Sequence, residues 1–179
     1  MSHVTLPVES HVLKYLLASQ DEEHYFLSEG DLFGMYLLRL LIEAPVERRR
    51  DAEVADYPGR WRVQLGSYAA WGLREPTGKV AYLFNAYVYK LLLHDMRGFV
   101  QQAVEDGGQA KHALHAFMAK YELLEEDIQF ETLLKSWQRY WSHRKGKGKR
   151  RVSLSGKLPL KELERTLLRT GEQTTRRAA

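Results

Sequence analysis

The sequence predicts an α+β protein that is mainly helical, with a small antiparallel sheet and a helical C-terminal half. Most of the chain carries apolar residues that recur every three or four positions, which is the spacing of one helix face. Alternation of apolar and polar residues, typical of a half-buried strand, is confined to short stretches in the first half. The sheet is expected from residues 3–8 and 60–65, with 68–74 as a candidate third strand, and 24–27 could form a further short strand.

The helical periodicity also orders the elements along the chain. The segment 32–43 is apolar on nearly every side, which predicts a central core element. Pro7 lies inside the first strand and cannot donate a ladder hydrogen bond, so it requires a sheet edge or a bulge. The helices are expected at residues 9–20, 32–43, 79–105, 110–121, 130–143 and 157–169.

Charge is divided unevenly along the chain. Residues 1–135 hold 14 Lys and Arg against 20 Asp and Glu, a net charge of −6, whereas residues 136–179 hold 13 against 3, a net charge of +10. An acidic body with a basic tail indicates a polyanionic partner, which we expect to be nucleic acid rather than a membrane. The predicted layout is one globular domain (1–143), a basic flexible segment (144–156) and a short amphipathic helix with a tail (157–179).

The composition excludes several classes of protein. The chain has no cysteine, so disulfides and thiolate metal sites are ruled out. No apolar run approaches the roughly 20 residues of a membrane-spanning helix. The N-terminus lacks the basic and apolar regions of a signal peptide, so the cytoplasm is the expected location.

The segments 110–121 and 130–143 have the outline of a helix-turn-helix, with the second helix ending in basic and aromatic residues. On that helix four residues lie off the apolar face, and their side chains are of the kind that bond phosphates and base edges: Lys135, Gln138, Arg139 and Ser142. An ordinary helical hairpin that closes the core accounts for the same spacing, so both interpretations stand.

The same region carries a resemblance to known proteins. The stretch from Ala113 to Leu123, together with Glu125-Glu126-Asp127 and Trp137-Gln138-Arg139-Tyr140, resembles the C-terminal helix pair of uncharacterised proteins encoded by bacterial phages and mobile elements. The resemblance covers a small part of the chain and brings no catalytic residue. It implies a setting in DNA transactions, such as a regulator or accessory factor of a mobile element.

The C-terminal tail holds two further candidate contact segments. Six of the eight residues 144–151 are Lys or Arg, a run that can neutralise phosphates or serve only as a solvated linker. Its predicted nucleic-acid-binding residues are Arg144, Lys145, Lys147, Lys149, Arg150 and Arg151. The segment 157–169 carries a leucine stripe expected to dock on a partner or on a second copy of the chain, formed by Leu158, Leu160, Leu163, Leu167 and Leu168. The alternative function is therefore a non-enzymatic interaction or oligomerisation module.

Aromatic residues offer a third candidate surface. The tyrosines at 82, 87 and 89 have a spacing that core packing explains better than base stacking. Trp61 and Trp71, in the strand region, are the better candidates for stacking on single-stranded nucleic acid.

We expect no enzyme activity, cofactor or metal. The sequence has no Gly-rich phosphate loop, no nucleophile elbow and no paired carboxylates beside a base. His112 and His115 share a helix face, but a third ligand is lacking. His94-Asp95 is the one pair with acid–base character, and a hydrogen bond on the helix surface explains it equally well.

Overall fold

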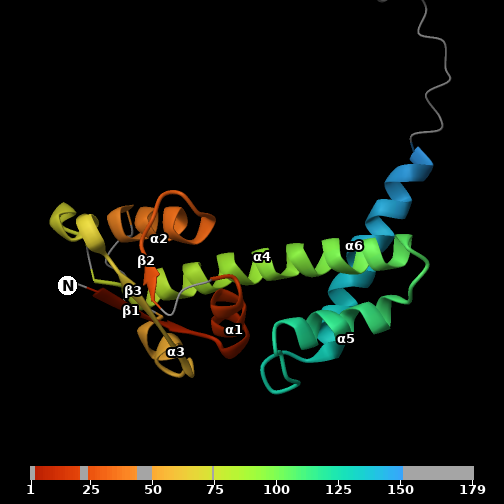
Figure 1. The fold of residues 1–179 in the computed structure, drawn as a ribbon, viewed down its shortest axis with the longest axis horizontal. Helices are drawn as coiled ribbons and strands as arrows, with labels where there is room; N and C mark the ends of the chain where they lie inside the picture. The colour runs from red at the N-terminus through yellow and green to blue at the C-terminus, as the bar shows by residue number, and fades with distance from the viewer. Residues whose placement is uncertain (1–2, 21–23, 44–49, 74, 151–179) are drawn as a thin grey trace, which may run out of the picture. The chain divides into compact units, whose positions relative to one another are not determined.

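The computed structural model describes residues 3–20, 24–43, 50–73 and 75–150, and for 145–150 the backbone alone. The chain divides into two compact units, residues 1–138, here called the body, and residues 139–179. The fold is α+β and mainly helical, as the sequence predicts (Figure 1). Arg151 and the predicted leucine-rich helix at 157–169 lie outside the described residues.

Three strands form a small sheet in the order β1-β3-β2. The central strand β3 (Gly59–Gln64) pairs antiparallel with β1 (His3–Val8) and parallel with the two-residue strand β2 (Tyr25–Phe26). Pro7 lies in β1, an edge strand, where its missing N–H costs no ladder hydrogen bond.

The two faces of β3 differ in character, as the two-residue period of a strand dictates. Trp61 and Val63 are buried, whereas Arg60 and Arg62 are exposed. The Trp61 ring is 2% exposed and stacks on Phe84, with 5.1 Å between ring centroids. Trp61 is therefore a core residue, and the expectation that it offers a surface for stacking bases is wrong.

The sheet departs from the sequence-based expectation in two places. It is mixed rather than purely antiparallel, because β2 runs parallel to β3. The candidate third strand at 68–74 is wrong, since residues Gly66–Trp71 form the 3-10 helix η1. Gly66 and Gly72 adopt left-handed φ angles of 55° and 64°, which glycine reaches without steric cost. These glycines bound a short helix instead of a hairpin.

Helices α1 (Ser10–Ala18), α2 (Leu32–Glu43) and α3 (Asp51–Ala55) each contact the long helix α4 (Gly78–Glu105). Asp31 caps α2, because its carboxylate accepts hydrogen bonds at 2.9 Å from two backbone N–H groups of the first turn.

Helix α2 is not the central core element that its composition suggested. Its inner side buries Leu37, Leu38 and Leu41, but Leu32 and Met35 are 54% and 51% exposed. The helix lies at the edge of the body, where it covers one side of α4 (Figure 1).

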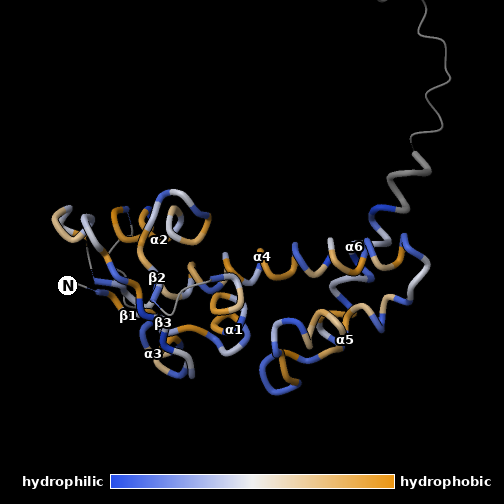
Figure 2. Tube along the Cα trace, in the orientation of Figure 1, coloured by the Kyte–Doolittle hydropathy of each residue, from blue (hydrophilic) through white to orange (hydrophobic). Residues whose placement is uncertain are grey.

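The central element is α4, whose buried residues recur every four positions, at Val80, Phe84, Val88, Leu92, Met96 and Val100. Four residues turn a helix by about 40° more than one full turn, so this stripe winds around the helix. Helix α4 packs on α1, α2, α3 and β1, and also against α5 (Ala110–Lys120). Figure 2 shows apolar and polar residues alternating along its whole length. No helix in the described part of the chain is long and apolar enough to cross a membrane.

Helix α6 (Phe130–Arg150) begins in the body and runs past His143, where the sequence analysis ended it. Lys and Arg are good helix formers, and positive charge near a helix C-terminus interacts favourably with the helix dipole. The first residues of the expected flexible segment, 144–150, are thus helical.

Two glycine substitutions test how tightly the body is packed. Gly34 lies in α2, and a Cβ there would collide with the Ser28 backbone and would approach the Tyr25 hydroxyl to 2.5 Å. We expect Gly34→Ala to lower the free energy of unfolding by about 1–3 kcal/mol, measured by urea denaturation. Gly98 is an exposed residue of α4 whose Cβ would meet no atom, so Gly98→Ala should instead raise stability by up to about 1 kcal/mol. Equal effects of the two substitutions would contradict the packing described.

Candidate functional site

The start of α6 is amphipathic. Leu133, Leu134 and Trp137 are buried in the body, and Trp137 is 4% exposed. Lys135 lies between Leu134 and Trp137 in sequence, Gln138 follows Trp137, and both are exposed. The helix period of 3.6 residues separates these two sets, so the predicted contact residues face away from the core.

The predicted contact residues continue along the same helix into the second unit. Arg139 and Arg144 are exposed, and Arg144 donates a hydrogen bond of 3.4 Å to the Tyr140 hydroxyl. Ser142 Oγ donates to the Arg139 carbonyl at 2.9 Å, so this hydroxyl serves the helix itself. The α6 backbone carries positions 145, 147, 149 and 150, whose side chains lie outside the described part, as do Arg151 and the leucine stripe.

Charge changes sign along α6. Glu131 stands in the first turn, and Glu125 accepts a hydrogen bond of 3.2 Å from the Phe130 N–H. Glu126 is exposed beside them. Acids at the N-terminus and bases at the C-terminus suit the helix dipole. The N-terminal end of α6 is therefore poorly suited to meet phosphates, and the C-terminal end is well suited.

The connection between α5 and α6 differs from that of a helix-turn-helix. It covers residues 121–129, longer than the three or four residues usual in that motif. Tyr121, Leu123 and Ile128 are buried along it. In helix-turn-helix proteins the N-terminal residues of the second helix read the bases, whereas here that end is acidic. The connection is thus longer, more buried and more acidic than that of a helix-turn-helix.

A partly buried ion pair joins the connection to α1. Lys14 Nζ donates to the Asp127 carboxylate at 2.5 Å and to the Glu122 carbonyl at 2.9 Å. The Asp127 side chain is 6% exposed and also accepts from the Leu124 N–H at 2.8 Å. Burial acts to raise the pKa of Asp127, but the hydrogen bonds from Lys14 and Leu124 outweigh it and hold the pKa below its ordinary value.

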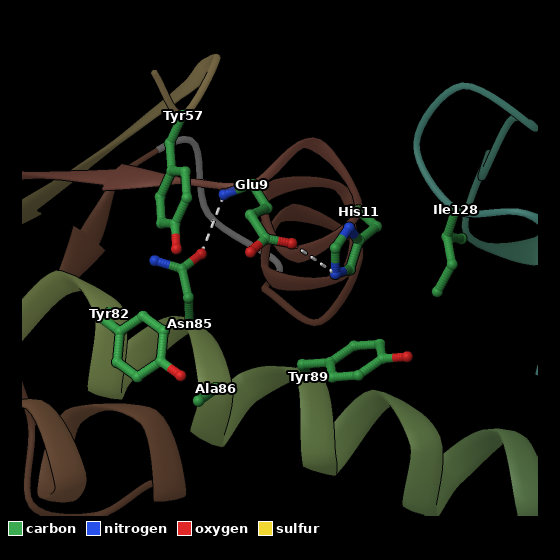
Figure 3. A pocket seen from close by; sticks show the side chains of 8 residues that line it. All are labelled: Glu9, His11, Tyr57, Tyr82, Asn85, Ala86, Tyr89 and Ile128. Carbon is green, nitrogen blue, oxygen red and sulfur yellow. Dashed lines mark hydrogen bonds and ion pairs between the residues drawn. The ribbon is translucent and has the colours of Figure 1, made fainter. Parts of the chain in front are cut away.

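A cavity of about 360 Å³ lies in the body between the start of α1 and one face of α4 (Figure 3). Helix positions 82, 85, 86 and 89 share this face, because they are three or four residues apart. The cavity is lined by Glu9, His11, Tyr57, Tyr82, Asn85, Ala86, Tyr89 and Ile128. Figure 3 shows the Glu9 carboxylate joined to His11, with Tyr82 and Tyr89 on α4 across from it.

Asn85 positions one wall of this cavity. It is 2% exposed, and its Oδ1 accepts a hydrogen bond of 2.9 Å from the Glu9 backbone N–H. Its Nδ2 donates to the Pro7 and Ala81 carbonyls at 3.0 and 2.8 Å. Both amide hydrogens are used, so Asn85 holds the junction of β1 and α1 on α4 and has no donor left for a ligand.

His11 stands between two acceptors. Its Nδ1 lies 3.2 Å from the Asp127 carbonyl and its Nε2 lies 3.2 Å from the Glu9 carboxylate. The ring packs edge-on against Tyr89, with 5.2 Å between centroids. Burial lowers the pKa of His11, although Glu9 and Asp127 act to raise it, and this favours the neutral imidazole. A neutral imidazole has one N–H and can serve only one of the two acceptors.

A second cavity, of about 520 Å³, lies between α1, α2 and α4. The Tyr15 hydroxyl donates to the Asp95 carboxylate at 2.5 Å, and burial together with this bond raises the pKa of Tyr15. Exposed Leu32 and Met35 form much of the apolar lining, and His94 also faces the cavity. The His94-Asp95 pair thus contributes a structural hydrogen bond to Tyr15 through Asp95.

Across the described residues, no group of three His, Asp or Glu side chains is placed to hold a metal ion. His112 and His115 are exposed, and His115 stacks on Phe130 with 4.3 Å between ring centroids. No protein-family model, curated protein or solved structure matches this chain. Function must therefore be argued from the residues themselves.

The cavity beside Glu9 was missed by the sequence analysis. Its residues come from the start of α1, the segment before β3, α4 and the α5–α6 connection, and only the tyrosines of α4 were considered. The spacing of these tyrosines could have indicated the cavity, because Tyr82 and Tyr89 are seven residues apart and lie on one helix face. Tyr87 lies on another face and stacks on Tyr36, with 4.0 Å between ring centroids.

Asp127 provides a test of the anchored connection. We expect Asp127→Asn to lower the free energy of unfolding at pH 7 by about 1–3 kcal/mol, because Lys14 loses its charged partner. The pKa of Asp127 is lower in the folded state, so its stabilisation is present above its ordinary value of 3.8 and is lost as the pH falls through the folded pKa. The free energies of unfolding of the two proteins, measured by urea denaturation, should therefore become equal at acid pH.

The exposed Arg39–Glu43 pair supplies the control. Its side chains are 71% and 61% exposed, so Glu43→Gln should change stability by less than about 0.5 kcal/mol. An Asp127→Asn protein as stable at pH 7 as this control would show that the ion pair does not hold the connection.

Proposed function

We propose that the protein binds nucleic acid, DNA in preference to RNA, through the basic C-terminal part of α6 and the run 144–151. The observation that carries the proposal is the exposure of Lys135, Gln138, Arg139 and Arg144 on one helix whose sequence continues into that run. Phosphate neutralisation by Lys and Arg supplies most of the affinity of such proteins.

The length of α6 supports this contact. From Lys135 to Arg150 the helix extends about 22 Å at 1.5 Å per residue. The major groove of DNA is about 12 Å wide, so a helix of this length can meet phosphates on both of its sides. The acidic residues at its start, such as Glu131, favour an approach led by the C-terminal part.

The residues of α6 divide into two roles under this proposal. Gln138 and Arg139 have side chains that form paired hydrogen bonds with adenine and guanine edges. The lysines and arginines of 144–151 bond phosphates, which fixes position without reading sequence. A regulator or accessory factor of a mobile element would use both, and the resemblance of 113–140 to phage and mobile-element proteins points to that setting.

A charge-removal series tests the phosphate contacts. Replacing Lys147, Lys149, Arg150 and Arg151 with alanine should weaken binding to all DNA sequences alike. The slope of log affinity against log salt should flatten by roughly 0.9 for each lost phosphate contact, measured by fluorescence anisotropy. The control removes four charges from the body, by alanine substitution of the exposed Arg39, Lys90, Lys111 and Lys120. It should keep nearly the affinity of the natural protein.

Truncation after Ser142 distinguishes the proposal from its rivals. If the truncated protein binds DNA as tightly as the full chain at physiological salt, the tail is not the contact surface. The contact would then be sought among the body's arginines, with Arg60 and Arg62 on the exposed face of β3 first. If the full chain does not bind DNA but is a dimer that the truncation makes monomeric, the leucine-rich segment 157–169 is an oligomerisation module instead.

Single substitutions test base readout separately. We expect Gln138→Ala and Arg139→Ala to reduce discrimination between DNA sites by about 1–3 kcal/mol per lost paired contact. Ser142→Ala is the matched control on the same helix, because its hydroxyl is bonded to the Arg139 carbonyl. The measurement is competition of a selected site against random-sequence DNA. Unchanged discrimination in both variants would limit α6 to phosphate binding.

A further inference from the structure

The cavity beside Glu9 has binding groups that its own walls do not use. Among the described residues, the hydroxyls of Tyr57, Tyr82 and Tyr89 have no hydrogen-bond partner. The Glu9 side chain is 41% exposed, and its one ionic neighbour in the described part is His11. These groups come from three separate segments and converge on one space (Figure 3).

The charge of the cavity is negative. Glu9 is the one acidic residue among the lining residues, and burial lowers the pKa of His11, which favours its neutral form. The nearby Lys14 and Asp127 neutralise each other. Arg50 pairs with Glu53 at 2.8 Å and lies over the Tyr82 ring. Among the lining residues, the Glu9 carboxylate thus has no Lys or Arg partner, and its one ionic neighbour is the His11 imidazole.

The field of Glu9 reaches the aromatic walls. Burial and then the Glu9 charge raise the pKa of both Tyr57 and Tyr89, whereas Arg50 acts to lower the pKa of Tyr57 and Arg97 that of Tyr89. An aromatic ring attracts a cation placed within about 6 Å of its centroid, so rings and carboxylate favour the same kind of ligand.

We propose that this cavity binds a small organic cation, an ammonium group carried on an aromatic or other apolar body. The ammonium would pair with the Glu9 carboxylate and lie against the ring of Tyr89, since Arg50 already lies over the Tyr82 ring. The apolar body would rest on Ala86 and Ile128, the apolar part of the lining. The volume of about 360 Å³ falls within the range of small-molecule sites.

Other classes of ligand fit the lining less well. Glu9 repels an anion, and Asn85 has no donor to offer one. A neutral polar ligand such as a sugar would leave the carboxylate without a counter-charge. The site is independent of α6, so it stands whether or not the chain binds DNA.

A pair of probes of nearly equal shape tests the charge requirement. Phenethylammonium and 2-phenylethanol are titrated separately into the full chain at pH 7 and followed by amide chemical shifts and calorimetry. We expect the ammonium to bind at least about tenfold more tightly than the alcohol, as a charge-assisted hydrogen bond implies. Equal affinity of the two probes, or no binding of the ammonium at millimolar concentration, would overturn the proposal.

Two substitutions locate the site. Glu9→Gln should weaken phenethylammonium binding about tenfold or more, whereas the carboxylate control Glu43→Gln, on an exposed face of α2, should not. Ala86→Leu fills the floor of the cavity and should abolish binding with the charge unchanged. Thermal unfolding of each variant confirms that it is folded. Affinity unchanged by Glu9→Gln, or by a folded Ala86→Leu protein, would show that the cation binds elsewhere.

Discussion

The whole body depends on one helix whose buried stripe repeats every four residues. A helix has 3.6 residues per turn, so the stripe from Val80 to Val100 turns steadily around α4. Its early positions, with Phe84 against Trp61, close the core beneath the small sheet. The helix also packs against α5. A three-stranded sheet with short helices could bury little apolar surface alone, and α4 provides the surface that all of them share.

The two candidate surfaces have opposite charge. The body is acidic, and the cavity beside Glu9 is lined by one carboxylate and three tyrosines. The residues after 138 are basic, and their charge increases toward the end of α6. Under the proposed function, an acidic body would discourage nonspecific contact of DNA with the rest of the molecule and would favour contact at the basic end. The two proposed ligands would therefore be opposite in charge, a small cation at Glu9 and a polyanion at the end of α6.

Sequence patterns predicted most helices and strands but did not predict the tertiary contacts between them. The helical period gave α4 within a residue, and Pro7 predicted a sheet edge, because both depend on local spacing. The parallel pairing of β2 was not accessible, since two residues carry no period. Gly66 and Gly72 signal a backbone turn, but whether it joins strands or bounds a 3-10 helix depends on packing. Of the candidate sites, the exposed face of α6 follows from periodicity. The Glu9 cavity does not, because its walls are far apart in sequence.

The winding stripe also limits how the length of this chain can change. One residue inserted in the middle of α4 would rotate everything beyond it by about 100° and advance it by about 1.5 Å. Leu92, Met96 and Val100 would then face solvent, and α5 would lose the apolar surface of α4 on which it packs. A four-residue insertion would rotate the second half by only about 40° and keep the spacing of the stripe. Natural variants of this fold should therefore vary in length at the ends of α4 and preserve the register of its centre.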